Sequence, residues 1–171
     1  GIGSKTGSGL PGESRGILPK VADWSGTTAP TVAFGQGYSV TAMQATSVFA
    51  TIANDGVRVS PTVIAGTSDS SGNYTPSATR ESVRVISAET AAQMRLMMES
   101  VVSANGTAPS AAIPGYRVAG KTGTAQRIDD TCGCYRGYTA SFIGFAPADN
   151  PAYVISVTIQ DPKGMHWGGY L

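Results

Sequence analysis

The spacing of apolar residues predicts two helices in the middle of the chain. The first is expected at residues 41–54, because Thr41 and Gln44 form an S/T-x-x-E/Q capping box and an Asn-Asp-Gly stop signal follows. The second is expected after Ser87, which suits an N-cap, and before the Asn-Gly pair at 105–106. Met94, either Met97 or Met98, and Val101 recur at helical spacing, and we expect this stripe in the core, where Met fills irregular gaps.

Alternation with a period of two takes over in the last third of the chain and indicates strands. We expect them at residues 116–119, 138–145 and 153–159, with an Asp-Asn-Pro turn joining the last two into a hairpin. Shorter strands at 57–59 and 62–64 precede a polar turn cluster and predict an exposed hairpin. The predicted fold is mixed α/β of the α+β type, with helices flanking an antiparallel sheet.

The composition fits a loop-rich folded domain. The chain has 171 residues, about one domain's length, and 41% of them are hydrophobic, while Gly 22 and Pro 10 indicate many loops. We expect residues 1–37 to form a loop-rich opening segment, because neither period is sustained there. Residues 38–110 should form a helical region with a small hairpin, and residues 111–171 should supply the sheet strands.

Charge and hydropathy exclude several classes of protein. Lys+Arg 12 against Asp+Glu 11 leaves a net charge of +1 without a basic cluster, so a nucleic-acid-binding or membrane-surface protein is not expected. No apolar run approaches the roughly 18 to 20 residues of a membrane span, and the first residues lack a signal peptide's apolar stretch. Any anchor is therefore expected outside these residues. Two cysteines and one histidine cannot form a four-ligand zinc site, and we expect neither metal nor cofactor.

Residues 115–122 (GYRVAGKT) match the phosphate-loop pattern G-x-x-x-x-G-K-[ST]. Such a site needs a buried strand before its first glycine and a helix that begins at the lysine, because the helix amides hold the phosphate. Here Pro114 precedes the first glycine, and Gly123 follows where the helix should run. A phosphate-loop nucleotide-binding protein therefore remains only as an alternative.

The same segment makes better chemical sense as an edge strand beside a cleft. Lys121 would supply a positive field, and Gly123 would let a substrate backbone approach. The hydroxyls of Thr122 and Thr124 would donate hydrogen bonds to a carboxylate. Amides of such an edge can pair with an extended peptide, and one can point into an oxyanion hole. These features suit a peptide that ends in a carboxylate, whereas a solvated edge lysine beside turn residues is the plainer interpretation.

Four segments of the chain carry a resemblance to a known family. They are residues 118–126 (VAGKTGTAQ), 35–44 (GQGYSVTAMQ), 53–56 (ANDG) and 142–147 (FIGFAP). The first closely resembles the K-T-G box of penicillin-binding proteins. Together the four look like the transpeptidase domain of class B, monofunctional penicillin-binding proteins, with the septal, cell-division branch the most similar. The resemblance covers nearly the whole chain in the family's order, so it is more specific than any single motif.

The resemblance implies a D,D-transpeptidase that cross-links peptidoglycan stem peptides through an acyl-enzyme on a serine, and that β-lactams acylate. Its catalytic residues would be Lys121, which assists proton transfer, and Thr124, whose amide completes the oxyanion hole. Thr122, Gly123 and Thr124 would bind the substrate or β-lactam. The implied partners are the stem peptide or its lipid-linked precursor, a septal glycosyltransferase and divisome proteins, outside the cytoplasmic membrane. A β-lactam-sensing receptor of the same fold is the non-enzyme alternative.

Two boxes of the family are missing from these residues. No Ser lies three positions before any Lys, so the S-x-x-K box with the nucleophile is absent. S-x-N occurs only at 71–73, in a turn cluster, and at 103–105, at a helix end. The family's final helix, which packs on the sheet, is absent too. We therefore expect residues 1–171 to be the C-terminal part of a single transpeptidase domain, inactive alone and completed by the remainder of that domain.

Cys132 and Cys134 lie in the loop after the K-T-G segment, near the expected mouth of the cleft. Cα atoms two residues apart can fall within the roughly 4.4 to 6.8 Å that a disulfide accepts. The compartment that the resemblance implies is oxidising. A disulfide that stiffens the loop is therefore favoured over free thiols. His166 and Trp167 are expected to serve loop packing.

Overall fold

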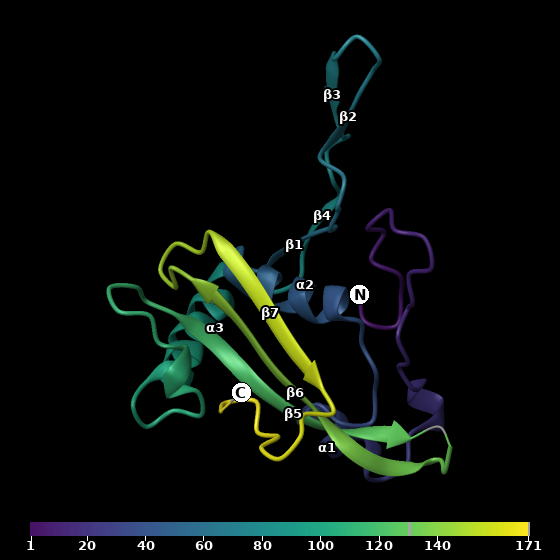
Figure 1. Ribbon diagram of the computed structural model, residues 1–171, viewed down its shortest axis with the longest axis vertical. Helices are drawn as coiled ribbons and strands as arrows, with labels where there is room; N and C mark the ends of the chain where they lie inside the picture. The colour runs from purple at the N-terminus through teal and green to yellow at the C-terminus, as the bar shows by residue number, and fades with distance from the viewer. Residues whose placement is uncertain (130, 171) are drawn as a thin grey trace.

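A three-stranded antiparallel sheet forms the centre of the computed structural model, which describes residues 1–129 and 131–170. The strands in spatial order are β5 (Ala119–Asp129), β6 (Cys134–Ala146) and β7 (Tyr153–Gln160). Figure 1 shows them side by side, with β5 and β7 at the two edges. The predicted α+β fold and the strands expected at 138–145 and 153–159 are confirmed.

The first strand of this sheet begins later than predicted. Residues 116–118 lie outside it, and the strand runs from Ala119 through the whole K-T-G segment. Gly115 has a φ of 83° in a turn where the Tyr116 amide donates to the Ile113 carbonyl at 3.0 Å. The apolar and polar residues that alternate before Ala119 therefore belong mostly to a turn. The small residues after Ala119 do not alternate in hydrophobicity, so the sequence did not indicate the rest of the strand.

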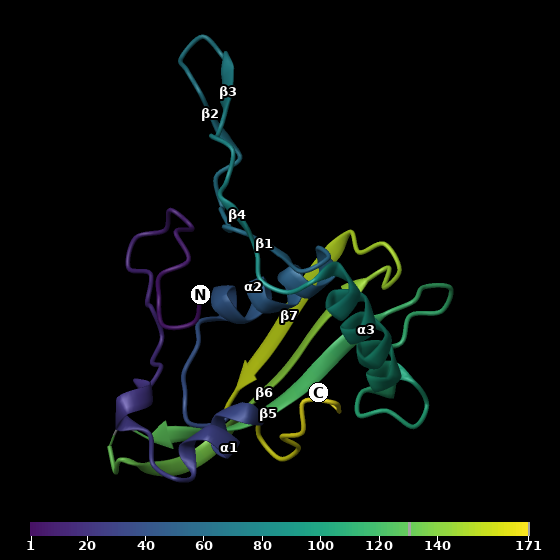
Figure 2. The same ribbon diagram turned by 180° about the vertical axis from the view of Figure 1, so that it is seen from behind.

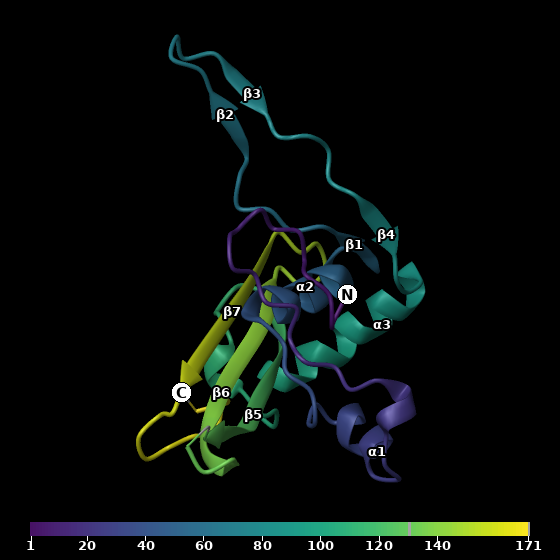
Figure 3. The ribbon, with the colours of Figure 1, turned by 90° about the vertical axis from the view of Figure 1, so that its right-hand side faces the viewer.

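Among the described residues, two helices pack on the sheet, both on the same face (Figure 2). They are α2 (Ala42–Ala53), which packs on β6 and β7, and α3 (Ala88–Glu99), which packs on β5. The buried core between the layers consists of Met98, Ala119, Phe145 and Ala148, with Phe49 and Ile52 packed against it. Met98 is thus a core residue as predicted, whereas its neighbour Met97 is 59% exposed. Figure 2 shows the helices in front of the sheet, and Figure 3 shows the C-terminal segment on the opposite side.

Both predicted helices are confirmed together with their caps. The Thr41 hydroxyl accepts a hydrogen bond from the Gln44 amide at 3.1 Å, and the Gln44 side chain accepts one from the Thr41 amide at 2.8 Å. The Ser87 hydroxyl accepts one from the Thr90 amide at 3.1 Å at the start of α3. A 3-10 turn, η2 (Ser100–Val102), continues α3 toward the predicted stop. These ends could be predicted because a cap is a local interaction.

A long arm projects from the molecule where a small hairpin was expected (Figure 1). It contains two antiparallel pairs, β1 (Val57–Val59) with β4 (Ser82–Arg84) and β2 (Gly66–Ser68) with β3 (Tyr74–Pro76). The strand predicted at 62–64 is wrong. There the Thr62 hydroxyl donates to the Ile64 carbonyl at 3.1 Å and accepts from the Ile64 amide at 3.0 Å. Local side-chain bonds of this kind compete with strand pairing.

The first 37 residues contain two short helical elements that the sequence analysis did not predict. They are η1 (Val21–Asp23) and α1 (Thr28–Ala33). Neither element buries a residue, so no apolar periodicity marks them. Another short 3-10 turn, η3 (Pro109–Ala111), precedes β5. Among the described residues, no helix combines the length and hydropathy that a membrane span requires.

Candidate active site

The K-T-G segment lies within β5, at an open edge of the sheet. It pairs with β6 in the register Lys121 with Ile143, Thr122 with Phe142, Gly123 with Ser141, and Thr124 with Ala140. In the part of the chain that the structure describes, β5 has no strand on its other side. A phosphate loop would need a helix that begins at Lys121, so the nucleotide-binding alternative is wrong.

Lys121 and Thr122 approach each other around the free edge of β5. Successive side chains of a strand point to opposite faces, so these two start on different sides of the sheet. The Lys121 Nζ nevertheless donates to the Thr122 hydroxyl at 3.3 Å and to the Thr122 carbonyl at 3.1 Å. No carboxylate within residues 1–129 and 131–170 forms an ion pair with this ammonium group. Its positive charge is therefore presented at the strand edge.

Two residues that the sequence analysis missed contact the hydroxyls of this segment. The Thr107 Oγ1 lies 3.3 Å from the Thr122 Oγ1, and the Gly168 amide donates to the Thr124 Oγ1 at 3.2 Å. A Cβ on Gly168 would lie 2.5 Å from two backbone carbonyl oxygens of β5 and β6, so the C-terminal segment needs glycine to lie this close. The Gly-Gly pair at 168–169 was an available signal, because glycine often marks a close backbone approach.

At two positions of this strand, neighbouring side chains leave no room for a residue larger than glycine. A Cβ on Gly120 would collide with the ring of Phe142, which lies across it from the neighbouring strand. A Cβ on Gly123 would lie 2.5 Å from the Ser141 hydroxyl. Gly120, the second glycine of the phosphate-loop match, is thus explained by sheet packing and not by a nucleotide.

The turn between β5 and β6 is fixed by a disulfide and by one carboxylate. Cys132 and Cys134 are bonded, with their Cα atoms 5.2 Å apart. The Asp129 carboxylate accepts hydrogen bonds from the Thr131 amide at 2.9 Å and the Thr131 hydroxyl at 2.5 Å, and mainly these bonds lower the pKa of Asp129. The turn is five residues beyond Thr124, about 16 Å along an extended strand. It stiffens the far end of the strand that carries the K-T-G segment.

His166 packs between aromatic rings. Its ring stacks on Tyr138 of β6 with centroids 4.0 Å apart and an interplanar angle of 10°, and the Trp167 ring lies 4.8 Å away. This arrangement agrees with the expected packing role. No group of three His, Cys, Asp or Glu side chains that could hold a metal occurs among the described residues.

Comparison with known proteins identifies the family. A sequence profile described as "Penicillin binding protein transpeptidase domain" matches residues 1–171. The chain belongs to this family. Penicillin-binding protein PbpB of Mycobacterium tuberculosis is 46% identical over 170 residues, which are 95% of this chain and 25% of that protein. Peptidoglycan D,D-transpeptidase FtsI of Escherichia coli is 36% identical over 177 residues, 99% of this chain and 27% of that protein.

A solved penicillin-binding structure has the same fold. The crystal structure of penicillin binding protein 3 from Mycobacterium tuberculosis, complexed with aztreonam, superposes with a TM-score of 0.91 at 45% identity. The match covers 99% of this chain and 39% of that one. The resemblance to class B penicillin-binding proteins is thereby confirmed. This chain spans about a quarter of the length of the relatives named above.

Proposed function

We propose that this chain supplies the K-T-G part of a peptidoglycan D,D-transpeptidase active site. The observation that carries the proposal is the open edge of β5, where the Lys121 ammonium lies beside the Thr122 hydroxyl on the strand that also carries Thr124. A relative is named a peptidoglycan D,D-transpeptidase, and a related structure is described as a complex with a β-lactam. The substrates are stem peptides, and β-lactams occupy the same edge.

The groups at this edge have separate parts in acyl transfer. A serine outside these residues attacks the peptide carbonyl and forms an ester as the peptide C–N bond breaks. Lys121 assists the transfer of the serine proton to the departing amine, and the amine of a second stem peptide then takes the acyl group from the serine. The Thr124 amide donates to the developing oxyanion. The hydroxyls of Thr122 and Thr124 donate to the terminal carboxylate of the peptide. Because the Gly168 amide already donates to the Thr124 oxygen, the hydroxyl proton of Thr124 remains for that carboxylate.

The proposal also covers the role of the chain in a larger molecule. Residues 1–171 form the C-terminal part of a single transpeptidase domain and take the S-x-x-K and S-x-N boxes from the remainder of that domain. The complete protein is membrane-anchored, faces the outside of the cytoplasmic membrane, and works with septal glycosyltransferase and divisome partners. The 171 residues alone form no acyl-enzyme, so a covalent adduct with fluorescent penicillin in mass spectrometry would contradict this part.

Removing the ammonium group of Lys121 tests the proposal. In the full-length protein, we expect Lys121→Ala to slow β-lactam acylation by at least about 10²-fold, the scale of losing a proton-transfer or electrostatic partner. Stopped-flow or gel-based acylation with a fluorescent penicillin measures the rate. Lys20→Ala is a matched control, because Lys20 is an exposed lysine far from β5 in sequence. Equal acylation rates in the two variants would place the active site elsewhere.

A further inference from the structure

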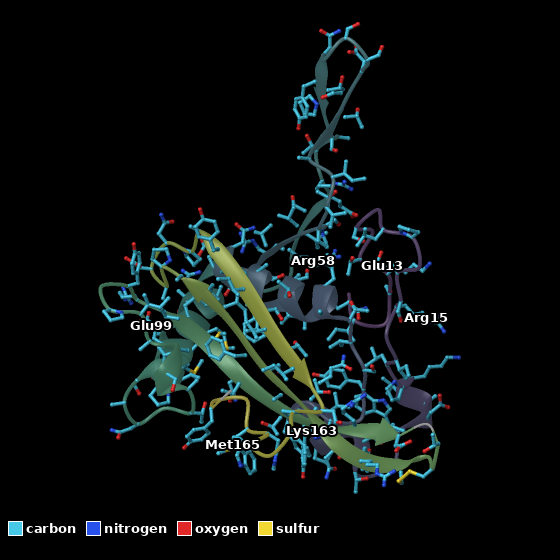
Figure 4. The ribbon with its side chains drawn as sticks, in the orientation of Figure 1. Glu13, Arg15, Arg58, Glu99, Lys163 and Met165 are labelled. Atoms are coloured by element: carbon cyan, nitrogen blue, oxygen red, sulfur yellow. A yellow bond between two sulfur atoms is a disulfide. The ribbon has the colours of Figure 1, made fainter. Side chains whose placement is uncertain are left out.

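A polar cavity of about 560 Å³ lies between the N-terminal loop and the base of the arm. Three cationic side chains line it from three segments: Lys5 from the loop, Arg58 from β1, and Arg80 just before β4. Hydroxyl groups complete the wall, from Ser60, Ser77 and Thr79. Figure 4 shows Arg58 at the base of the arm and Glu13 on the facing loop. No residue of β5 lines this cavity.

The loop side of the cavity is held in place by two side chains. The Glu13 carboxylate accepts hydrogen bonds from the Thr6 amide at 2.6 Å, from the Thr6 hydroxyl and from the Gly7 amide at 3.3 Å. The buried Gln44 of α2 donates to the Ser4 and Arg15 carbonyls at 2.8 and 2.9 Å. The position of Lys5 in the wall therefore follows from an organised loop.

The three cations of the cavity have no ion-pair partner in the described residues, as is also true of Arg15, Arg84 and Arg127. Arg95 and Arg117 bind carboxylates at 2.7 Å. In contrast, no carboxylate oxygen of residues 1–129 or 131–170 lies within 4 Å of the cationic nitrogens of Lys5, Arg58 or Arg80. Arg80 donates to the Thr62 hydroxyl at 2.5 Å, while its Nε is buried without a hydrogen-bond partner.

The cavity carries a net positive charge even when the two acidic residues near it are counted. Of the described residues that line the cavity, one is an acid, Glu81, and three are cations. Glu13 is not one of the lining residues, and its carboxylate oxygens accept hydrogen bonds from loop donors at Thr6, Gly7 and Ser8. The Ser77 hydroxyl donates to the Ile64 carbonyl at 3.0 Å, which leaves the hydroxyls of Ser60 and Thr79 as donors toward the cavity. Guanidinium and ammonium groups without ion pairs, together with hydroxyl donors, are the chemistry that binds phosphate and carboxylate oxygens.

We propose that this cavity binds a small oxyanion with more than one anionic group, such as a diphosphate or a polycarboxylate. The volume lies in the range of roughly 300 to 1,000 Å³ that is usual for small-molecule sites, so a lone phosphate would underfill it. Guanidinium groups bind the oxygens in pairs, and Lys5 at the loop side neutralises the remaining charge. The proposal does not depend on the transpeptidase activity.

Calorimetric titration of the full-length protein with pyrophosphate, and separately with citrate, tests this site. We expect saturable binding of at least one anion, weakened about tenfold by Lys5→Gln and by Arg58→Gln, the loss of one charge-assisted contact each. Neither side chain makes a hydrogen bond within the described residues, so both variants should fold, which their melting temperatures will show. Lys20→Gln is the matched control, and it should bind like the unmodified protein.

The outcomes separate the ligand classes. Binding of pyrophosphate alone assigns a phosphate-bearing ligand, and binding of citrate alone assigns a carboxylate-bearing one. No saturable binding of either anion would overturn the proposal. Binding that both cavity variants retain unchanged would overturn it equally, because the anion would then occupy another site.

Discussion

At the scale of single residues, the chemistry of β5 depends on which side chains surround each hydroxyl. Thr122 has Lys121 on one side and Thr107 on the other, both at 3.3 Å from its Oγ1. Thr124 accepts a bond from the Gly168 amide at 3.2 Å. These contacts fix the positions of the two hydroxyls beside the strand. A substitution at Gly168 that displaces the C-terminal segment should therefore affect both the stability of the protein and its acylation.

Gly168→Ala should destabilise the full-length protein by about 1–3 kcal/mol, because its Cβ would press on the carbonyl oxygens of Gly123 and Ser141. Acylation by penicillin should slow as well, since Thr124 loses the hydrogen bond from the Gly168 amide. Gly26→Ala is the matched control, because nothing lies within 4 Å of its Cβ position. Urea unfolding and acylation rates are the measurements. Indistinguishable behaviour of the two variants would mean that the close approach at Gly168 is not needed.

At the scale of elements, the sequence predicted the helix caps but missed one local set of hydrogen bonds and one distant contact. The caps at Thr41 and Ser87 were predictable because their partners lie three residues away. The break at 62–64 was not predicted, because there the Thr62 hydroxyl forms hydrogen bonds with the Ile64 backbone in place of strand pairing. Within the candidate site, the K-T-G segment could be recognised from the sequence alone. The contact from Gly168, 44 residues away, required the fold.

Gln44 of α2 fixes the N-terminal loop by hydrogen bonds. Its side chain closes the capping box and also donates to the Ser4 and Arg15 carbonyls, so replacement leaves buried polar groups unpaired. We expect Gln44→Met to lower the free energy of unfolding by about 2 kcal/mol or more. Gln93→Met, at an exposed position of α3, should change it little. Equal denaturation midpoints for the two variants would show that Gln44 does not hold the loop.

The loop that Glu13 organises should depend on pH. Its hydrogen bonds, above all that from the Thr6 hydroxyl, lower the pKa of Glu13 below the ordinary 4.5. A lowered pKa in the folded state stabilises the loop above pH 4.5, and this stabilisation is lost as the pH falls through the folded pKa. Hydrogen exchange of residues 4–13, corrected for intrinsic rates, should rise there. Protection that stays constant down to about pH 3, as expected for Glu13→Gln, would contradict this account.

At the scale of the whole molecule, the sheet separates two environments. Helices α2 and α3 bury one face, and the C-terminal segment crosses the other (Figure 3). The candidate site lies at the edge between them, where Thr107, β5 and Gly168 meet. The match to the transpeptidase family covers residues 1–171, so this edge, with its lysine and threonines, lies inside the matched region.

The most direct test of the central claim is a crystal structure of the full-length protein acylated by a penicillin. We expect the β-lactam carboxylate to accept hydrogen bonds from the Thr122 and Thr124 hydroxyls at about 2.6–3.2 Å, with the acyl group beside the open edge of β5. A covalent adduct whose carboxylate contacts no residue of β5 would contradict the account.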